Sequence, residues 1–246
     1  MIASLPMYDR PELRTETDRF WQAIRERLGH GPDHLTRGGD PWDDWQSPDL
    51  LLSQTCGYPY RARLHGRVAL VGTPDYALDG CGPGEYRSVF VARAKDARTD
   101  PVEFAAARFA YNEPMSQSGW AAPAAWAEAH GFEFTDTLRT GSHQASARAV
   151  AEGGADLAAL DAQTWRLMQR FEAFTTELRV IAATDPSPAL PFITAPANDA
   201  DTVFRAVETA IAALPSETRN ALGLRGIVRL PPEAYLAIPT PAPPRA

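Results

Sequence analysis

An α/β fold is predicted by the way two kinds of apolar pattern alternate along the 246-residue chain. Short runs rich in β-branched and other apolar residues are typical of strands. Between most of them lie longer stretches whose apolar residues recur every three or four positions, as in amphipathic helices. Repeated strand, helix, strand order favours an α/β protein with mostly parallel sheets, and the sequence contains no internal repeat.

The elements follow from these two patterns in chain order. Alternating or continuous apolar runs predict strands at Ile2–Met7, Asp49–Gln54, Arg67–Val71, Ser88–Arg93, Arg108–Asn112, Phe134–Arg139, Asp156–Leu160, Leu178–Ala183 and Ile227–Leu230. Apolar residues at three- and four-residue spacing predict helices at Glu12–Leu28, Ser118–His130, Gln144–Glu152, Thr164–Phe174 and Ala200–Leu214. The tail from Pro231 on contains too many prolines for a helix, and we expect it to lie extended over the first lobe.

Two extended runs, Tyr86–Asp96 and Glu177–Pro188, each lead from one compact block into another. We therefore expect a pair of crossing strands between two lobes. The first lobe would contain residues 1–93 and 184–246, and the second, inserted lobe residues 94–183. A ligand cleft between the lobes is the expected consequence.

Composition limits the possible partners. The net charge is −7, the isoelectric point is near 5.3, and Lys95 is the only lysine, so the chain lacks the basic cluster that nucleic-acid binding requires. No apolar run approaches the roughly 20 residues that span a bilayer, so we expect no direct membrane insertion. The start, MIASLPMYDRPE, lacks the basic and apolar regions of an export signal, which predicts a cytoplasmic location for the chain as given.

Neither a metal nor a cofactor is expected. Cys56 and Cys81 allow only one pairing and fit no four-ligand zinc pattern. The glycine and proline between His30 and His34 interrupt the helix that a metal-binding pair would need. Because both cysteines follow neighbouring predicted strands, we expect them to approach one another, and a disulfide would indicate an oxidising compartment.

The stretch YNEPMSQSGW, Tyr111 to Trp120, leads from a predicted strand end directly into a helix. The first N–H groups of a helix have no internal partner and the helix dipole adds positive charge, so an oxyanion is favoured there. Ser116 and Ser118 would add hydroxyl donors, and Gly119 would let a ligand approach the backbone closely. The alternative is that Ser116 is an ordinary helix N-cap, a common arrangement.

Two further strand ends point to the same edge of the sheet. His143, in the run Gly-Ser-His, follows a predicted strand and begins a helix, and Asp161 ends another predicted strand. Parallel strands would bring Ser118, His143 and Asp161 together, where ligands of α/β proteins bind. The alternatives are a capping or surface role for His143 and an N-cap role for Asp161.

With these motifs, SQSG, TGSH, EGGADLAALD and the return segment LRVIAATDPSPALPF, the sequence resembles the phosphate, phosphite and phosphonate-binding proteins of ABC importers over nearly its whole length. The resemblance implies a type II periplasmic-binding fold, two α/β lobes joined by two strands. It implies that Ser116, Gln117, Ser118 and His143 belong to the two loops that grip the oxyanion head group. An acidic residue holds a ligand amine or a protonated oxygen in this family, and Asp161 matches that position best.

Within that fold the first lobe is expected to contribute contacts from its own strand ends. They are Tyr8, Ser53, Gln54, Thr55 and Tyr58, whose hydroxyl and amide groups suit the remaining oxygens of an anion. For the two tyrosines the alternative is packing at the rim.

The resemblance implies a non-catalytic, monomeric protein that closes its lobes around a phosphonate, phosphite or phosphate and serves an ABC permease. That role belongs in the periplasm. No nucleophile and base are recognisable as a pair in the sequence, so an enzyme is not expected. The alternative is a cytoplasmic enzyme or ligand sensor on the same scaffold, such as a relative of the thiamine-pyrimidine-precursor synthases, whose cysteine-rich motif this chain lacks.

Overall fold

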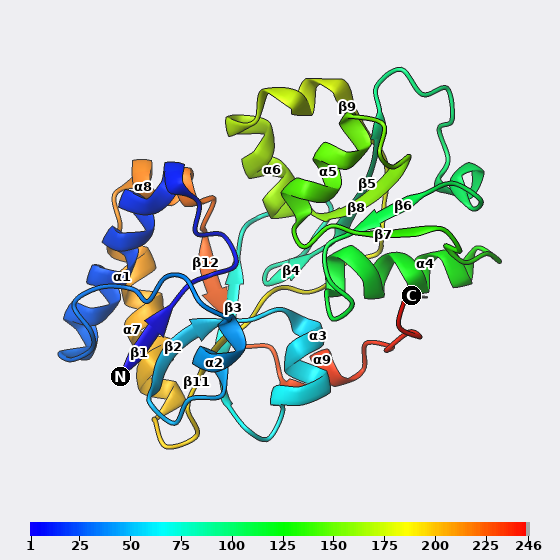
Figure 1. Cartoon of the computed structure of the whole chain (residues 1–246). Helices are drawn as coiled ribbons and strands as arrows, with labels where there is room; N and C mark the ends of the chain where they lie inside the picture. The colour runs from blue at the N-terminus through cyan, green and yellow to red at the C-terminus, as the bar shows by residue number, and fades with distance from the viewer. Residues whose placement is uncertain (245–246) are drawn as a thin grey trace. The chain divides into compact units, whose positions relative to one another are not determined.

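The computed structural model describes residues 1–244, which form two compact units (Figure 1). Unit 1 contains Met1–Glu85 and Pro188–Ala237, and unit 2 contains Tyr86–Ser187 and, of the described tail, residues 238–244. The chain therefore passes between the units after residues 85, 187 and 237, whereas the sequence analysis places the boundaries after residues 93 and 183.

Unit 1 is built on a five-stranded sheet in the order β1-β2-β11-β3-β12. The strands are β1 (Ile2–Ser4), β2 (Leu50–Gln54), β3 (Ala69–Asp75), β11 (Phe192–Thr194) and β12 (Gly226–Val228). β1 and β2 are parallel, while β11 is antiparallel to β2 and β3, and β12 is antiparallel to β3. The carboxyl ends of β1 and β2 therefore meet at one edge.

The longer helices of unit 1 are α1 (Arg14–Leu28), α7 (Ala200–Ala213) and α8 (Ser216–Leu222). α1 follows a 3-10 turn at Pro11–Leu13, packs on α7 and buries Phe20, Trp21 and Ile24. The short helices are α2 (Pro41–Trp45), α3 (Gly57–Pro59), a π-helical turn at Tyr60–Leu64 and α9 (Pro232–Leu236).

Unit 2 contains a second five-stranded sheet in the order β7-β6-β8-β5-β9. The strands are β5 (Ser88–Arg93), β6 (Phe109–Tyr111), β7 (Thr137–Arg139), β8 (Leu157–Asp161) and β9 (Leu178–Ala183). The helices are α4 (Ala122–Ala129), which continues a π-helical turn at Gln117–Ala121, α5 (His143–Ala151) and α6 (Ala162–Phe171), with 3-10 turns at Pro101–Phe104 and Ala173–Glu177. β6 is parallel to β7 and β8, so the carboxyl ends of these three strands share one edge.

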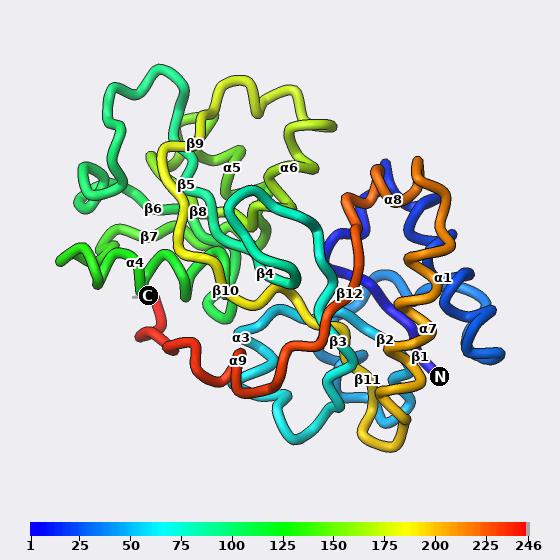
Figure 2. The backbone as a smooth tube through the Cα atoms, turned by 180° about the vertical axis from the view of Figure 1, so that it is seen from behind, coloured from blue at the N-terminus to red at the C-terminus, as the bar shows by residue number. Residues whose placement is uncertain are grey.

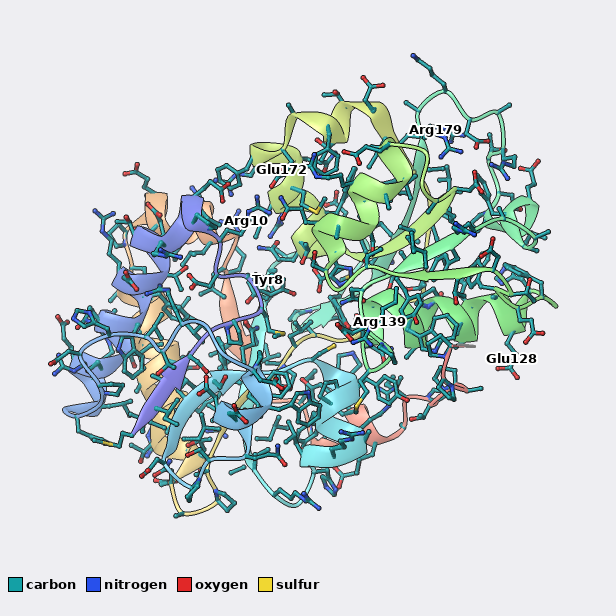
Figure 3. All side chains as sticks on the ribbon, viewed as in Figure 1. Tyr8, Arg10, Glu128, Arg139, Glu172 and Arg179 are labelled. Atoms are coloured by element: carbon teal, nitrogen blue, oxygen red, sulfur yellow. The ribbon has the colours of Figure 1, made fainter. Side chains whose placement is uncertain are left out.

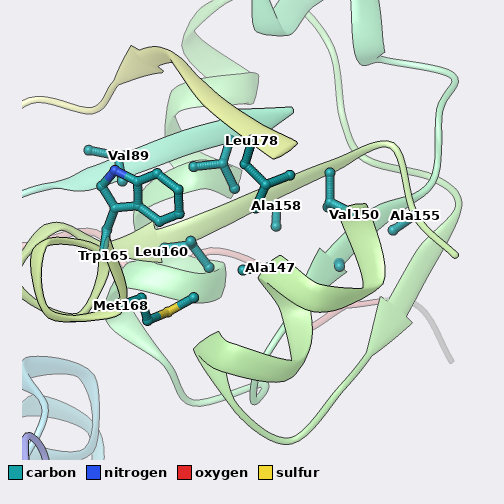
Figure 4. Packing of buried hydrophobic residues seen from close by; sticks show 11 residues of the cluster. Val89, Ala147, Val150, Ala155, Ala158, Leu160, Trp165, Met168 and Leu178 are labelled. Atoms are coloured by element: carbon teal, nitrogen blue, oxygen red, sulfur yellow. The ribbon is translucent and has the colours of Figure 1, made fainter. Parts of the chain in front are cut away.

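The core of unit 2 fixes the helices that follow these strand ends. Ala147 and Val150 of α5 are fully buried in one cluster with Ala158 and Leu160 of β8 (Figure 4). A second cluster contains Trp120 beside α4, together with Phe109 and Phe134. Because both helices are anchored by buried apolar side chains, their first turns are held in place at the strand ends.

The sheets are mixed, so the expectation of mostly parallel sheets is wrong. β5 is antiparallel to both β8 and β9, and β11, a strand of unit 1, is a three-residue element that the sequence analysis missed. Most of Tyr86–Asp96 and Glu177–Pro188 belongs to the sheet of unit 2. The passages between the units lie at the ends of these segments, in the paired strands β4 (Glu85–Tyr86) and β10 (Ser187–Pro188).

The tail also differs from expectation. Residues Pro232–Leu236 form helix α9, because a proline in the first helical turn loses no intrahelical hydrogen bond. The residues that follow belong to unit 2 rather than lying over the first lobe (Figure 2). There the indole N–H of Trp120 donates to the carbonyl of Ala242 at 2.9 Å.

Cys56 and Cys81 are not joined in a disulfide, so the inference of an oxidising compartment from a disulfide does not apply. Among residues 1–244 no helix is both long and apolar enough to cross a bilayer. The same part of the chain contains no group of three or more His, Cys, Asp or Glu side chains arranged to hold a metal ion.

Candidate functional site

Three strand ends of unit 2 position the candidate residues. β6 leads into the turn that contains Ser116, Ser118 and Gly119, β7 leads into the loop before His143, and β8 ends at Asp161. The parallel pairing of β6 with β7 and β8 places these ends side by side.

Ser116 is the N-cap of the first of these helices. Its Oγ accepts a hydrogen bond from the N–H of Gly119 at 3.0 Å, and its carbonyl accepts from the N–H groups of Trp120 and Ala121 at 3.2 and 2.9 Å. The wider π-helical first turn at Gln117–Ala121 results. Within residues 1–244, the main-chain N–H of Ser118 donates to no group, so it is available to a ligand.

Gly141 shapes the loop that carries His143. Its φ of 87° lies in the left-handed region, which glycine adopts without strain. The N–H of Gly141 donates to the carbonyl of Asn112 at 3.0 Å, and the N–H of Thr140 donates to the carbonyl of Tyr111 at 2.9 Å. Ser142 then caps α5, whose first residue is His143. The two loops are therefore tied together by main-chain hydrogen bonds.

Ser118 and His143 form a direct pair, with Oγ of Ser118 3.0 Å from Nε2 of His143. Ser118 is only 2% exposed. Nδ1 of His143 is buried and makes no hydrogen bond of normal geometry within residues 1–244. Burial lowers the pKa of His143 to about 4, against the weaker opposing effect of the Ala159 carbonyl. The imidazole is therefore neutral at neutral pH in the ligand-free protein.

Asp161 is the N-cap of α6, as its alternative interpretation predicted. Its Oδ1 accepts from the N–H of Thr164 at 2.8 Å. In the register of β5 and β8, Asp161 lies opposite Ser88, whose N–H donates to Oγ1 of Thr184 at 3.1 Å. The buried Oγ of Ser88 has no hydrogen-bond partner in the described chain.

The sequence analysis missed three polar residues at this edge: Asn112, Ser88 and Thr184. Asn112 ends a predicted strand and Ser88 begins one, so their positions in the sequence could have indicated that they lie at this edge of the sheet. The space beside Gly119 is also occupied differently from expectation. A Cβ placed on Gly119 would lie 1.8 Å from Oδ1 of Asn112, so this glycine makes room for a side chain of the protein itself.

Formal charge near the two loops is neutralised locally. Arg139 at the end of β7 forms an ion pair with Glu113, which precedes the Ser116 turn (Figure 3). Gln117, between the two serines, is buried and neutral. The donors that the loops offer are thus hydroxyl, imidazole and main-chain N–H groups.

In unit 1, the three candidate residues at the end of β2 are buried and form hydrogen bonds within the unit. Oγ of Ser53 lies 2.9 Å from Oγ of Ser4, and Nε2 of Gln54 donates to the hydroxyl of Tyr76 at 3.2 Å. Thr55 is fully buried, and its N–H donates to the carbonyl of Pro191 at 3.1 Å. These side chains therefore support the strand end from within.

Of the two candidate tyrosines, Tyr8 is half-buried, whereas Tyr58 is buried with 9% of its surface exposed. Tyr8 follows β1 (Figure 3), packs edge-on against Tyr76 at 5.1 Å between ring centroids, and with Gln54 lines a cavity of about 40 Å³. The ring of Tyr58 lies under the guanidinium of Arg61 at 4.4 Å. Both are packing contacts, which agrees with the alternative role of rim packing given for these tyrosines in the sequence analysis.

A family model described as "ABC transporter, phosphonate, periplasmic substrate-binding protein" matches residues 49–235. The chain belongs to this family. Its members are substrate-binding components of transporters, and the matched region includes every candidate residue except Tyr8. No curated protein matches the sequence.

Solved structures of this kind share the fold. PhnD1 from Prochlorococcus marinus, in complex with methylphosphonate, superposes with a TM-score of 0.74 at 16% identity, covering 96% of this chain and 94% of that one. A binding-protein component of an ABC phosphonate transporter from Pseudomonas aeruginosa gives 0.69 at 15% identity, covering 92% and 80%. The fold is the two-lobed type II periplasmic-binding fold, as expected from the sequence.

Proposed function

We propose that this family member binds a small phosphorus oxyanion, a phosphonate, phosphite or phosphate, at the loops Ser116–Gly119 and Gly141–His143, and delivers it to an ABC permease. The observation that carries the proposal is the Ser118–His143 pair at the start of two helices. Beside it lies a main-chain N–H of Ser118 that has no partner in the described chain. A helix start with free donors favours an anion.

The chemistry of the site suits reversible capture. Neutral donors stabilise an oxyanion through hydrogen bonds of about 1.5–3 kcal/mol each without the stronger attraction of a fixed positive charge. In the ligand-free protein, Ser118 and His143 satisfy one another. This hydrogen bond keeps both side chains ordered before binding, and a bound ligand would replace it with hydrogen bonds of its own.

Closure of the two lobes is the proposed output of binding. A ligand shifts such an equilibrium only if it makes contacts in the closed form that the open form lacks. Tyr8, Gln54 and Tyr58 are the proposed contacts of unit 1, and Asp161 would hold a ligand amine or a protonated oxygen. Closure predicts a smaller radius of gyration for the ligand-bound protein. Small-angle scattering with and without ligand measures this difference.

One observation favours a second candidate. A serine hydroxyl 3.0 Å from a histidine nitrogen is the arrangement of a nucleophile and its base. In enzymes a third group, such as a carboxylate, orients the base. The group beside the imidazole of His143 is instead the Ala159 carbonyl, with which Nδ1 makes no hydrogen bond of normal geometry. We therefore favour binding over hydrolysis. Release of alcohol from a phosphonate ester by the purified protein would favour the enzyme instead.

The ligand class is tested by calorimetric titration of the purified protein with methylphosphonate, aminoethylphosphonate, phosphite, phosphate and sulfate. The proposal predicts saturable 1:1 binding of at least one phosphorus oxyanion. Failure of all four phosphorus compounds to bind would refute it. The periplasmic location and the monomeric state are parts of the same proposal, tested by cell fractionation and by light scattering.

A further inference from the structure

Asn112 lies between the two proposed ligand loops and contacts both. Its main-chain carbonyl accepts the hydrogen bond from Gly141 at 3.0 Å. Its side chain packs on the other loop, where a Cβ on Gly119 would lie 1.8 Å from Oδ1 and 2.9 Å from Cγ. Asn112 thus sets the spacing of the Ser116–Gly119 turn and the Gly-Ser-His loop.

The amide of Asn112 is positioned by its packing against Gly119. Oδ1 is buried and accepts no hydrogen bond within residues 1–244. Leaving a buried carbonyl oxygen unpaired costs about 1–3 kcal/mol, and such groups are uncommon in folded proteins. An apolar side chain of the same shape would avoid this cost, so packing alone does not account for an asparagine here.

We propose that Asn112 is a further ligand-binding residue of this site: Gly119 fixes the orientation of its amide, and the amide amino group donates to the bound oxyanion. The inference rests on the proposed function. Asn112 is half-buried as a residue, and its Oδ1 is the buried end of the amide. The amino group is consequently the end that turns away from Gly119.

This assignment changes the role of Gly119. A side chain at position 119 would displace the amide before it touched a ligand. The amino group is a neutral donor, like the hydroxyl and N–H of Ser118, and it does not titrate. Its contribution to affinity should therefore be constant over the pH range in which His143 changes its charge.

The central test compares Asn112→Leu with the wild type by calorimetric titration with methylphosphonate and by thermal unfolding. Leucine keeps the branched shape and removes the donor. We expect at least a tenfold weaker affinity, with an unfolding temperature unchanged or raised because the unpaired oxygen is gone. Wild-type affinity in this variant would overturn the proposal. Asn220→Leu, on exposed Asn220 in α8, is the matched control and should bind as the wild type does.

A double variant separates ligand contact from space filling. In Asn112→Ala/Gly119→Ala the new methyl at position 119 occupies space that the amide has left. We expect its affinity to stay at least tenfold below that of the wild type, whereas recovery of wild-type affinity would show that Asn112 only fills space. If Asn112→Leu does not fold, the double variant carries the same test.

The outcomes also distinguish this proposal from the one on which it rests. Absence of binding of any phosphorus oxyanion to the wild type refutes the proposed function itself. Binding that Ser118→Ala weakens and Asn112→Leu leaves intact refutes only the role of Asn112.

Discussion

Ser118 Oγ and His143 Nε2 are 3.0 Å apart, although 25 positions separate the two residues in the sequence. The contact joins the starts of two helices that follow neighbouring parallel strands, β6 and β7. It forms because buried apolar side chains anchor each helix and main-chain hydrogen bonds tie the two loops. The core of unit 2 therefore determines the geometry of the proposed ligand site.

The imidazole of His143, whose Nδ1 is buried, predicts a specific pH dependence of stability. Burial lowers the pKa of His143 from 6.5 to about 4, so between these values the unfolded chain binds a proton that the folded protein does not. Stability should then fall as the pH falls from 6.5 to 4, with a limiting slope of about 1.4 kcal/mol per pH unit from this group. Denaturant titrations should show a shallower slope in His143→Gln.

Exposed His34 provides the control for that experiment, since His34→Gln should leave the slope as it is in the wild type. An identical slope in the wild type and His143→Gln would show that His143 titrates normally. The same low pKa also bears on the ligand site, because it leaves the imidazole of His143 neutral in the ligand-free protein at neutral pH.

A carboxylate far from the site predicts acid sensitivity in a lower pH range. Arg98 donates to both oxygens of Asp96, at 2.9 and 2.6 Å, and holds the pKa of Asp96 at about 2 instead of 3.8. A depressed pKa stabilises the fold above pH 3.8, and this stabilisation is lost as the pH falls towards 2. Asp96→Asn should flatten that part of the stability profile.

Exposed Asp79 is the matched position for this test, and Asp79→Asn should retain the wild-type profile. Circular-dichroism unfolding at pH 5, 4 and 3 measures the difference. Parallel profiles for the wild type and Asp96→Asn would contradict the prediction.

The hydrogen bond from Trp120 to Ala242 predicts how the tail is held. Trp120→Phe should keep the ring packed against Tyr111, 5.3 Å away between centroids, and remove one hydrogen bond worth about 0.5–1.5 kcal/mol. We expect faster amide exchange in the segment that follows Ala237, measured by mass spectrometry. Trp45→Phe in unit 1 also loses one indole hydrogen bond, to Gln54, and should not change exchange in the tail. Equal exchange in both variants would refute the anchoring role.

Two predicted strands have the observed bounds. Ser88–Arg93 is β5, which is buried over its first five residues, and Leu178–Ala183 is β9, in which only Leu178 is buried. Both runs carry six residues of strand-forming pattern, which is enough to define their ends. The short strand β11 and the proline-initiated helix α9 were missed. The three residues of β11 are too few to show a strand pattern. The prolines at the start of α9 were taken to exclude a helix, although a proline is tolerated in the first helical turn.

The site was predictable where it depends on topology and unpredictable where it depends on side-chain direction. Strand ends placed Ser118 and His143 at one edge, which needed only the rule for parallel strands. The packing of Asn112 on Gly119 follows from how one amide turns after β6. The role of Asp161 was unpredictable for the same reason. A carboxylate at a strand end can cap the following helix or hold a ligand, and its position in the sequence is the same in both cases.

The most direct test of the central claim is the affinity of Ser118→Ala for the phosphorus oxyanion that binds the wild type best, measured by calorimetry at pH 7. Loss of a hydrogen bond to a charged ligand should weaken binding by about 1.5–3 kcal/mol, roughly 10- to 150-fold. Ser216→Ala, at an exposed helix start in unit 1, should leave affinity unchanged. Equal affinities for the wild type and Ser118→Ala would contradict an oxyanion site at the Ser118–His143 pair.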